Sequence, residues 1–179
     1  MDSDESHPTT IEVIMKRKSV RKYTDEKVSE ETLEKIVRAG MAAPTAANKQ
    51  PWSFIIITDR ETLDKLAEKM PYSKMLFKAP AAIVVCGVPK WGLPDRENDF
   101  WIQDCSAASE NILLAVESLG LGAVWTGAYP IEQRVKDVRN ILGIPKDVVP
   151  LNVIAIGHPT GVEKPKDKWK PERVHRNKW

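Results

Sequence analysis

The chain has 179 residues, of which 42% are hydrophobic and 29% charged, and its formal net charge is +2. This length supports the core of one ordinary domain, and the nearly neutral charge excludes a protein that draws polyanions to its whole surface. The chain has 2 cysteines, Cys86 and Cys105, both in apolar surroundings, which excludes a disulfide framework and a cysteine-rich metal site. We therefore expect a single cytoplasmic domain over residues 1–179, with no membrane contact and a polar, disordered leader over residues 1–9.

Apolar residues at helical spacing predict five helices in the chain. Residues that favour helix starts, such as Ser29 and Asp59, and glycines that follow helix ends bound several of them. The predicted helices cover residues 10–18, 30–41, 60–70, 100–119 and 131–142. The helix over 100–119 is the longest, and small or apolar residues cover most of its circumference, which predicts burial on several sides.

Short runs of β-branched and apolar residues predict four or five strands between these helices. The runs identified cover residues 52–58, 81–88, 123–126 and 151–156. Because strands that alternate with helices ordinarily form parallel sheets, the order of the elements alone predicts a parallel α/β sheet. Beyond Gly157 the chain has no periodicity, and Trp169 and Trp179 in this Pro- and Lys-rich tail need cover that a neighbouring subunit could supply.

Basic residues gather in two segments of the chain. Residues 16–22 hold five Lys or Arg, and residues 161–179 hold seven against three acids. Arg17, Ser19 and Arg21 occupy alternating positions of an extended segment, so they share one side and can hold a phosphate through charge-assisted hydrogen bonds. The alternative is that these cations only complement the carbonyl-rich end of the helix before them. A nucleic-acid-binding module is disfavoured, because the first cluster has no stacking aromatics and no recognised binding motif surrounds either one.

Two further segments carry groups that suit a planar ligand. The loop over 43–51 presents the side chains of Thr45, Asn48 and Gln50, whose donors and acceptors suit a polar ring edge, although a plain turn explains its Pro and Asn equally well. Small residues after the strand at 123–126 let a planar ligand lie against the backbone, or simply mark the exit of that strand.

Five motifs, in this order, carry a resemblance to a known family. They are R-K-S-V-R-K-Y at 17–23, A-P-T-A-A-N-K-Q-P-W at 43–52, D-C-S-A-A-S-E-N-I-L-L-A at 104–115, G-L-G-A-V-W-T-G at 120–127 and I-A-I-G-H-P at 154–159, followed by the basic tail. Together they resemble the nitroreductase superfamily of flavin enzymes. The resemblance implies an α+β, α/β/α-like nitroreductase fold, with a central mixed and largely antiparallel sheet flanked by helices. It also implies a homodimer whose C-terminal segments, residues 158–179, are exchanged between subunits.

The resemblance further implies FMN as the cofactor and NAD(P)H as the co-substrate. Hydride would pass by way of the flavin to a small electrophilic acceptor (a nitroaromatic, a quinone or a flavin) in a ping-pong mechanism. No catalytic residue is expected from the protein, because the flavin carries the chemistry. Two alternatives stay open. One is another flavin reaction on the same scaffold, such as reductive dehalogenation or flavin fragmentation, and the other is a non-catalytic FMN-binding protein.

The resemblance assigns the FMN site, at the subunit interface, to four segments. The basic segment binds the phosphate and ribityl groups, the loop of the opposite subunit lines the flavin, the end of the strand at 123–126 approaches its ring, and the tail closes the phosphate site. The residues expected to bind FMN are Arg17, Lys18, Ser19, Arg21, Pro44, Thr45, Ala46, Asn48, Gln50, Trp125, Thr126, Gly127, Lys166 and Lys168, with Lys170 as the alternative to Lys168.

Aromatic residues flank the loop over 89–99. The favoured interpretation of Trp91, Phe100 and Trp101 is that they anchor the start of the helix over 100–119 in the core. Trp91 and Phe100 could instead stack over a bound acceptor and exclude water. His158 is expected to be structural, because nothing in the sequence flanks it as a catalytic partner.

Overall fold

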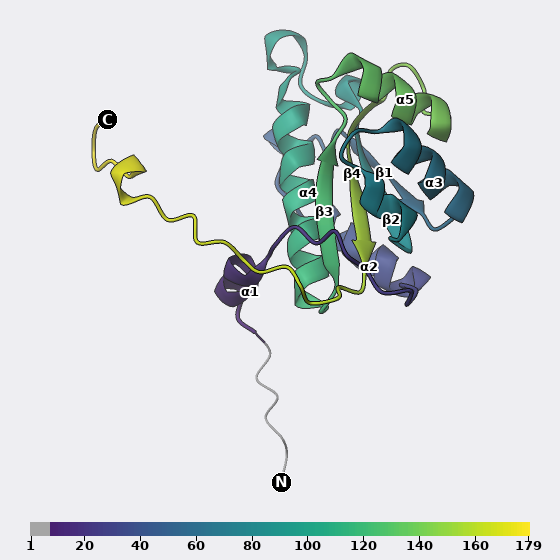
Figure 1. Cartoon of the computed structure of the whole chain (residues 1–179). Coiled ribbons are helices and arrows are strands. Elements are labelled where there is room, and N and C mark those ends of the chain that lie inside the picture. The colour runs from purple at the N-terminus through teal and green to yellow at the C-terminus, as the bar shows by residue number, and fades with distance from the viewer. Residues whose placement is uncertain (1–7) are drawn as a thin grey trace.

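The computed structural model describes residues 8–179, and its centre is a four-stranded sheet in the order β1-β2-β4-β3 (Figure 1). The strands are β1 (Trp52–Ile57), β2 (Ala81–Gly87), β3 (Gly122–Gly127) and β4 (Val149–Gly157). Every neighbouring pair is antiparallel, so the parallel sheet predicted from the order of elements is wrong. The antiparallel sheet implied by the resemblance is confirmed, and an isolated parallel bridge joins Ser19 to Ala123 at the edge strand β3.

The connection between β1 and β2 explains why the sheet is antiparallel. After β1 the chain forms α3 (Arg60–Lys69), and residues 70–80 then return it to the end at which β1 stopped. Ala82 therefore pairs with Ile57 rather than with the start of β1. Apolar periodicity reports which side chains are buried, but it carries no information about this return.

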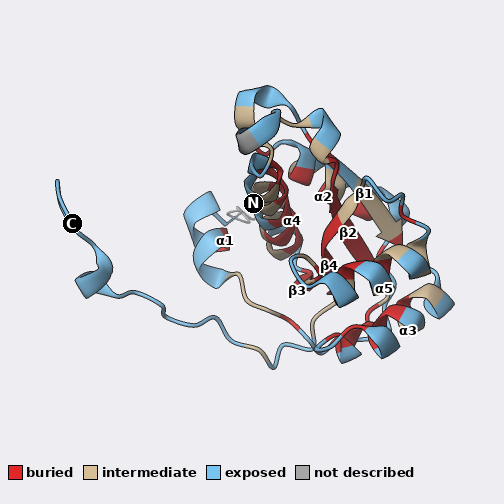
Figure 2. Ribbon diagram, turned by 90° about the horizontal axis from the view of Figure 1, so that it is seen from above, coloured by how far each residue is buried: buried red, intermediate tan, exposed pale blue. Residues whose placement is uncertain are grey.

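Helices cover both faces of the sheet. On one face, α3 and α5 (Glu132–Leu142) pack on alternate side chains of β2, including Ala82, Val84 and Cys86. On the other face, α2 (Glu30–Met41) and α4 (Phe100–Ser118) pack on the intervening side chains. All of β2 is buried as a result, which confirms the buried strand predicted from its β-branched run (Figure 2). The α/β/α arrangement implied by the resemblance is also confirmed.

The N-terminal helix is shorter than its sequence pattern predicts. α1 covers Thr10–Lys16 instead of residues 10–18, because the chain becomes extended at Arg17. Thr9 and Glu12 form a capping box at its start, while residues 1–7 of the expected leader lie outside the described part of the chain. Two of its apolar side chains are exposed, with exposed fractions of 68% for Ile11 and 71% for Met15.

Helix α4 runs along the sheet and packs in the core on one of its faces. Eight of its 19 residues are buried, including the polar residues Asp104 and Ser109. The Ser109 hydroxyl donates to the Cys105 carbonyl at 2.8 Å and accepts a hydrogen bond from the Asn152 side chain at 2.8 Å. The helix thus fastens to β4 through a polar contact within the core, and its prediction as a buried helix is confirmed.

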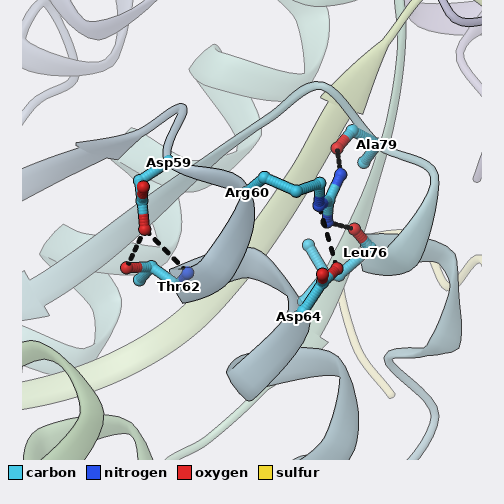
Figure 3. Close-up of polar contacts among 6 residues, drawn as sticks. All are labelled: Asp59, Arg60, Thr62, Asp64, Leu76 and Ala79. Carbon is cyan, nitrogen blue, oxygen red and sulfur yellow. Dashed lines mark hydrogen bonds and ion pairs between the residues drawn. The ribbon is translucent and has the colours of Figure 1, made fainter.

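Two charged residues fix the start of α3 (Figure 3). The Asp59 carboxylate accepts a hydrogen bond from the Thr62 backbone at 2.8 Å, as its prediction as an N-cap requires. The Arg60 guanidinium donates to the carbonyl of Ala79 at 3.0 Å and also to the carbonyl of Leu76. Arg60 therefore joins α3 to the segment that leads into β2.

We expect Arg60→Ala to lower the free energy of unfolding by about 1–3 kcal/mol, because two partly buried carbonyls lose their donor. Lys65→Ala on the same helix is the control, since the Lys65 side chain only forms an exposed ion pair with Glu61. Urea denaturation of the two variants measures the difference. Equal midpoints would show that Arg60 does not hold the segment before β2.

Candidate functional site

The basic segment, residues 16–22, begins at the last residue of α1 and lies against the edge strand β3. The Val20 amide donates to the Ala123 carbonyl at 2.9 Å, and the Val20 side chain is only 1% exposed. Because side chains of an extended segment alternate, burial of Val20 turns Ser19 and Arg21 toward the opposite side. The alternation predicted for Arg17, Ser19 and Arg21 is therefore present in the structure.

A glycine makes this approach possible. A Cβ atom added at Gly122, the first residue of β3, would lie 2.7 Å from Cβ of Val20. Any other residue would push the basic segment away from the strand, because real Cβ contacts are longer. The position of the basic segment thus depends on Gly122 at the start of the strand as well as on its own residues.

The basic segment and the tail face each other across a cleft of about 710 Å³. Residues predicted from the two ends of the sequence meet here, and they are Arg17, Lys18, Ser19, Arg21, Lys166 and Lys168. Lys164 also lines the cleft, whereas Lys170, the alternative to Lys168, does not. Ile14, Met15 and Trp169 supply its apolar walls. The structure therefore gathers a cationic surface from segments that are far apart in the chain.

Two of these cations already have partners on α4. The Lys18 ammonium lies 3.0 Å from the Glu117 carboxylate, and both side chains are largely shielded from solvent. The Arg17 guanidinium lies 3.5 Å from Glu110, whose side chain is half exposed. We infer that Lys18 mainly fastens the basic segment to α4, while Arg17, Arg21 and the tail lysines present their charge to the cleft.

The loop over 43–51 is a strained structure held by its own hydrogen bonds. Ala47, Asn48 and Gln50 have φ angles of 48°, 53° and 51°, a region that residues other than glycine rarely adopt. The Gln50 backbone donates to the Thr45 hydroxyl at 3.1 Å, and the Gln50 side chain donates to the Asn48 side chain at 3.0 Å. Strain of this kind persists only where the surroundings fix it, and it is common at functional sites.

A buried carboxylate anchors this loop to α4. Asp104 accepts a hydrogen bond from the Ala46 backbone at 2.9 Å. Asp104 and Glu117 are 13 positions apart, which is about 20 Å along a helix. None of Pro44, Thr45, Ala46, Asn48 and Gln50 lines the cleft. Arg17 contacts α4 at Glu110, which is six positions, or about 9 Å, from Asp104. The structure nevertheless does not place the predicted loop residues in the cleft of their own chain.

The end of β3 offers backbone and small side chains rather than free polar groups. The Thr126 hydroxyl donates to the Val153 carbonyl, so this group is used within the sheet. The Gly127 carbonyl accepts a hydrogen bond from Arg134 at 3.3 Å. Trp125 and Gly127 are half-buried. These predicted residues are adjacent on β3, beyond the residues of the strand that contact the basic segment.

The three aromatic residues near the loop over 89–99 have different environments. Trp101 is buried and packs edge-on against Tyr129, with ring centroids 5.0 Å apart, which confirms it as a core anchor. Trp91 and Phe100 are 51% and 38% exposed, so the core-anchor interpretation is wrong for them. The Trp91 amide donates to the Val88 carbonyl at 2.9 Å, and the Val88 amide donates to the Pro51 carbonyl at 2.8 Å. Trp91 is therefore tied to the end of the strained loop.

Cys86, Cys105 and His158 do not line the cleft. Burial raises the pKa of both cysteine thiols to about 12, and Cys86 and Cys105 are free and buried, as predicted. His158 lies 3.5 Å from Glu26 and outside the cleft.

Over residues 8–179 there is no group of three or more His, Cys, Asp or Glu side chains placed to hold a metal ion. None of the helices in this part of the chain has the length and apolar composition that crossing a lipid bilayer requires.

Sequence reasoning missed three acidic residues at or near the site, Asp104, Glu163 and Asp167. Glu163 lines the cleft but was counted only as an acid in a basic tail, and a lone acid there carries no recognisable signal. Asp104 had a signal, because it lies on the buried face of a mostly apolar helix. A carboxylate in that position needs a hydrogen-bond donor from elsewhere in the fold.

The fold places the chain in the α+β class, and comparison with known proteins identifies its family. Residues 14–71 and 67–158 match the model of the Nitroreductase family. A protein of Archaeoglobus fulgidus, named provisionally as an NADH dehydrogenase/NAD(P)H nitroreductase, is 47% identical over 172 residues, which cover 94% of this chain and 98% of that protein. The chain belongs to the nitroreductase family.

Solved structures agree with this assignment. A Parabacteroides distasonis protein with the same provisional name has a TM-score of 0.90 and 49% identity, covering 95% of this chain and 98% of its own. An FMN-dependent nitroreductase from Clostridium difficile has a TM-score of 0.86 and 30% identity, covering 94% of this chain and 99% of its own. The nitroreductase fold expected from the sequence is confirmed.

We expect Gly122→Ala to lower the free energy of unfolding by about 1–3 kcal/mol, because the new Cβ overpacks against Val20. Hydrogen exchange of the Val20 amide should also become faster, since the basic segment must move away from β3. Gly127→Ala, at the other end of the strand, is the control, because a Cβ there meets only the Tyr129 carbonyl at 4.0 Å. Unchanged Val20 exchange in Gly122→Ala would contradict the close contact.

Proposed function

We propose that this chain catalyses the transfer of hydride from NAD(P)H to a small electrophilic acceptor (a nitroaromatic, a quinone or a flavin) in a ping-pong mechanism with FMN as its cofactor. The observation that carries the proposal is the cationic cleft between the basic segment and the tail, in a chain of the nitroreductase family. The enzyme class is that of an NAD(P)H-dependent FMN oxidoreductase, in agreement with the names of its relatives. FMN supplies the chemistry of accepting and releasing hydride.

The residues of the cleft fit a mononucleotide phosphate. Two guanidiniums, from Arg17 and Arg21, can each give paired donors to phosphate oxygens, and Ser19 can add a hydroxyl donor. Lys166 and Lys168 add positive charge from the opposite wall. The volume of about 710 Å³ is within the range of about 300–1,000 Å³ that is usual for cofactor sites. The sequence has no Gly-rich dinucleotide fingerprint, which favours FMN over FAD.

The protein's own contribution is binding and positioning. Each charge-assisted hydrogen bond from Arg17 or Arg21 stabilises a bound phosphate by about 1.5–3 kcal/mol. At the end of β3, Gly127 lets a planar group approach the strand. Because the Thr126 hydroxyl already donates to Val153, we infer that Trp125, Thr126 and Gly127 act there mainly through backbone groups and shape.

We further propose that the site is completed by a second copy of the chain. The loop residues Pro44, Thr45, Ala46, Asn48 and Gln50 lie outside the cleft of their own chain, and we assign them to the flavin of the opposite subunit. A homodimer also explains the uncovered apolar surface. Ile11 and Met15 on α1 are exposed, and Trp169 is 67% exposed on a tail that extends away from the domain (Figures 1 and 2). Residues 158–179 would then embrace the partner.

The acceptor side of the site is assigned to Trp91 and Phe100. Both rings are partly exposed, and Trp91 is tied to the strained loop, so either ring can stack on a planar acceptor. We also propose a reducing compartment, the cytoplasm, because Cys86 and Cys105 are both free thiols.

The identity and reactivity of the flavin test the enzyme. We expect the purified protein to be yellow, with about one FMN per subunit, and its visible absorbance to bleach anaerobically when NADH or NADPH is added. A nitroaromatic, a quinone or free flavin should then restore the absorbance. Recovery of FAD would overturn the cofactor assignment, and absorbance that does not bleach would favour a non-catalytic FMN-binding protein. Recovery only with a halogenated substrate would favour reductive dehalogenation, and loss of the flavin itself on turnover would favour flavin fragmentation.

The oligomeric state tests the shared site. We expect the full-length protein to sediment as a dimer at low micromolar concentration, and a variant lacking residues 163–179 to lose both the dimer and FMN. The reason is that the same tail carries Lys166, Lys168 and the apolar side chains that need cover. Analytical ultracentrifugation with absorbance at protein and flavin wavelengths measures both properties at once. A full-length monomer that retains FMN would contradict the two-subunit site.

A further inference from the structure

Glu163 is the point at which the tail is attached to the domain. From residue 161 to residue 179, it is the only residue that is not exposed. Its Oε1 atom accepts hydrogen bonds from the backbone amides of Arg21 at 2.8 Å and Lys22 at 3.1 Å. Beyond Glu163, the hydrogen bonds found in the described tail connect tail residues to one another, such as Trp169 to Asp167.

The two amides held by Glu163 belong to the basic segment. Just before them, the Val20 amide pairs with β3, and just after them the Lys22 carbonyl accepts a hydrogen bond from Thr160 at 3.1 Å. The Glu163 carboxylate therefore fills the gap between these two contacts. Together they fix the backbone of Arg21 between the sheet and the beginning of the tail.

Glu163 is ionised in this position. Burial alone would raise the pKa of Glu163, but hydrogen bonds from the Arg21, Glu163 and Lys22 backbones and the charge of Lys22 outweigh that effect and keep the pKa below its ordinary value. Oε2 is buried and has no hydrogen-bond partner. A carboxylate that lines a cationic cleft and uses only one oxygen is therefore placed to orient backbone rather than to neutralise a particular cation.

We propose that Glu163 is a positioning residue for the FMN phosphate, which it serves by clamping the backbone of Arg21 and Lys22 to the start of the tail. This inference rests on the proposed function, because it takes that phosphate as the ligand of the cleft. Lys166 follows Glu163 by three residues, a reach of at most about 10 Å. Fixing Glu163 thus confines Lys166 to the wall of the cleft opposite Arg17 and Arg21. Without the clamp, FMN would have to order the tail on binding, and its affinity would fall.

Three variants separate the clamp from the charge of Glu163. Glu163→Ala removes the acceptor, and Glu163→Gln keeps an acceptor oxygen but removes the charge. Glu172→Ala is the matched control, because Glu172 is an exposed acid of the same tail and lies outside the cleft. If Glu163 acts as a clamp, Glu163→Gln should preserve the FMN binding that Glu163→Ala weakens, and Glu172→Ala should leave it unchanged.

The measurement is FMN affinity of the FMN-stripped, full-length protein, from quenching of FMN fluorescence. We expect Glu163→Ala to weaken binding about tenfold or more, and Glu163→Gln and Glu172→Ala to stay within about threefold of wild type. The amide NMR signals of Arg21 and Lys22 should move strongly in Glu163→Ala and little in Glu163→Gln. Urea midpoints checked in parallel should change much less than FMN affinity does.

The outcomes distinguish this inference from the proposed function. Arg21→Ala should weaken FMN binding about ten- to a hundredfold, and Lys16→Ala, on an exposed neighbour outside the cleft, should not. Wild-type protein that binds no FMN, or Arg21→Ala that binds normally, would refute the assignment of the cleft. If Arg21→Ala weakens FMN binding as expected but Glu163→Ala keeps wild-type affinity, only the clamp is refuted. Equal losses of FMN affinity in Glu163→Ala and Glu163→Gln would also refute only the clamp.

Discussion

The hydrogen bond from the Val20 amide to the Ala123 carbonyl decides where the site forms. β3 is an edge strand, and an edge strand has unpaired backbone groups that another segment can use. The basic segment pairs with this edge over a very short length. Gly122 makes the pairing possible, because it leaves room for the Val20 side chain. Because Val20 points into the core, its neighbours Ser19 and Arg21 must point outward. The cationic wall of the cleft is therefore a consequence of strand geometry at one edge of the sheet.

Helix α4 sets the distance between the two halves of the site. Glu117 holds Lys18 toward the C-terminal end of the helix, and Asp104 holds the strained loop toward the other end. The helix keeps these two contacts about 20 Å apart, and none of the predicted loop residues lines the cleft of its own chain. In a dimer with two-fold symmetry, the same surface serves both subunits, and each loop can meet the cleft of the other chain. The absence of the loop residues from the cleft of their own chain is thus the reason to propose a shared site.

The sequence predicted the elements better than their arrangement. Helical and strand periodicity report burial, so the helices, the strands and the fully buried β2 could all be predicted, but strand direction depends on how residues 70–80 return the chain. The basic segment and the tail lysines were recognised through motifs, whereas the bond from Glu163 to the Arg21 amide required tertiary structure. The ion pair of Lys18 with Glu117 was equally hidden, because a lysine in a basic cluster has the same pattern whether its charge is free or paired.

The positive charge of the cleft comes from a few residues, and carboxylates pair with only some of them. The other cations can bind an anionic ligand firmly. The chain as a whole is nearly neutral, so attraction of an anion depends on the few cations that remain available beside Ser19. Arg17 shows how such a cation can be paired and still bind a ligand. Its guanidinium lies 3.5 Å from the carboxylate of Glu110, and the Glu110 side chain is half exposed. Although the Arg17 side chain is only 19% exposed, solvent at the half-exposed Glu110 screens the pair. Such a pair contributes about 0–1 kcal/mol, less than a charge-assisted hydrogen bond to phosphate. Glu110 can therefore orient Arg17 before a phosphate binds and yield it afterwards, which lowers the cost of ordering that side chain.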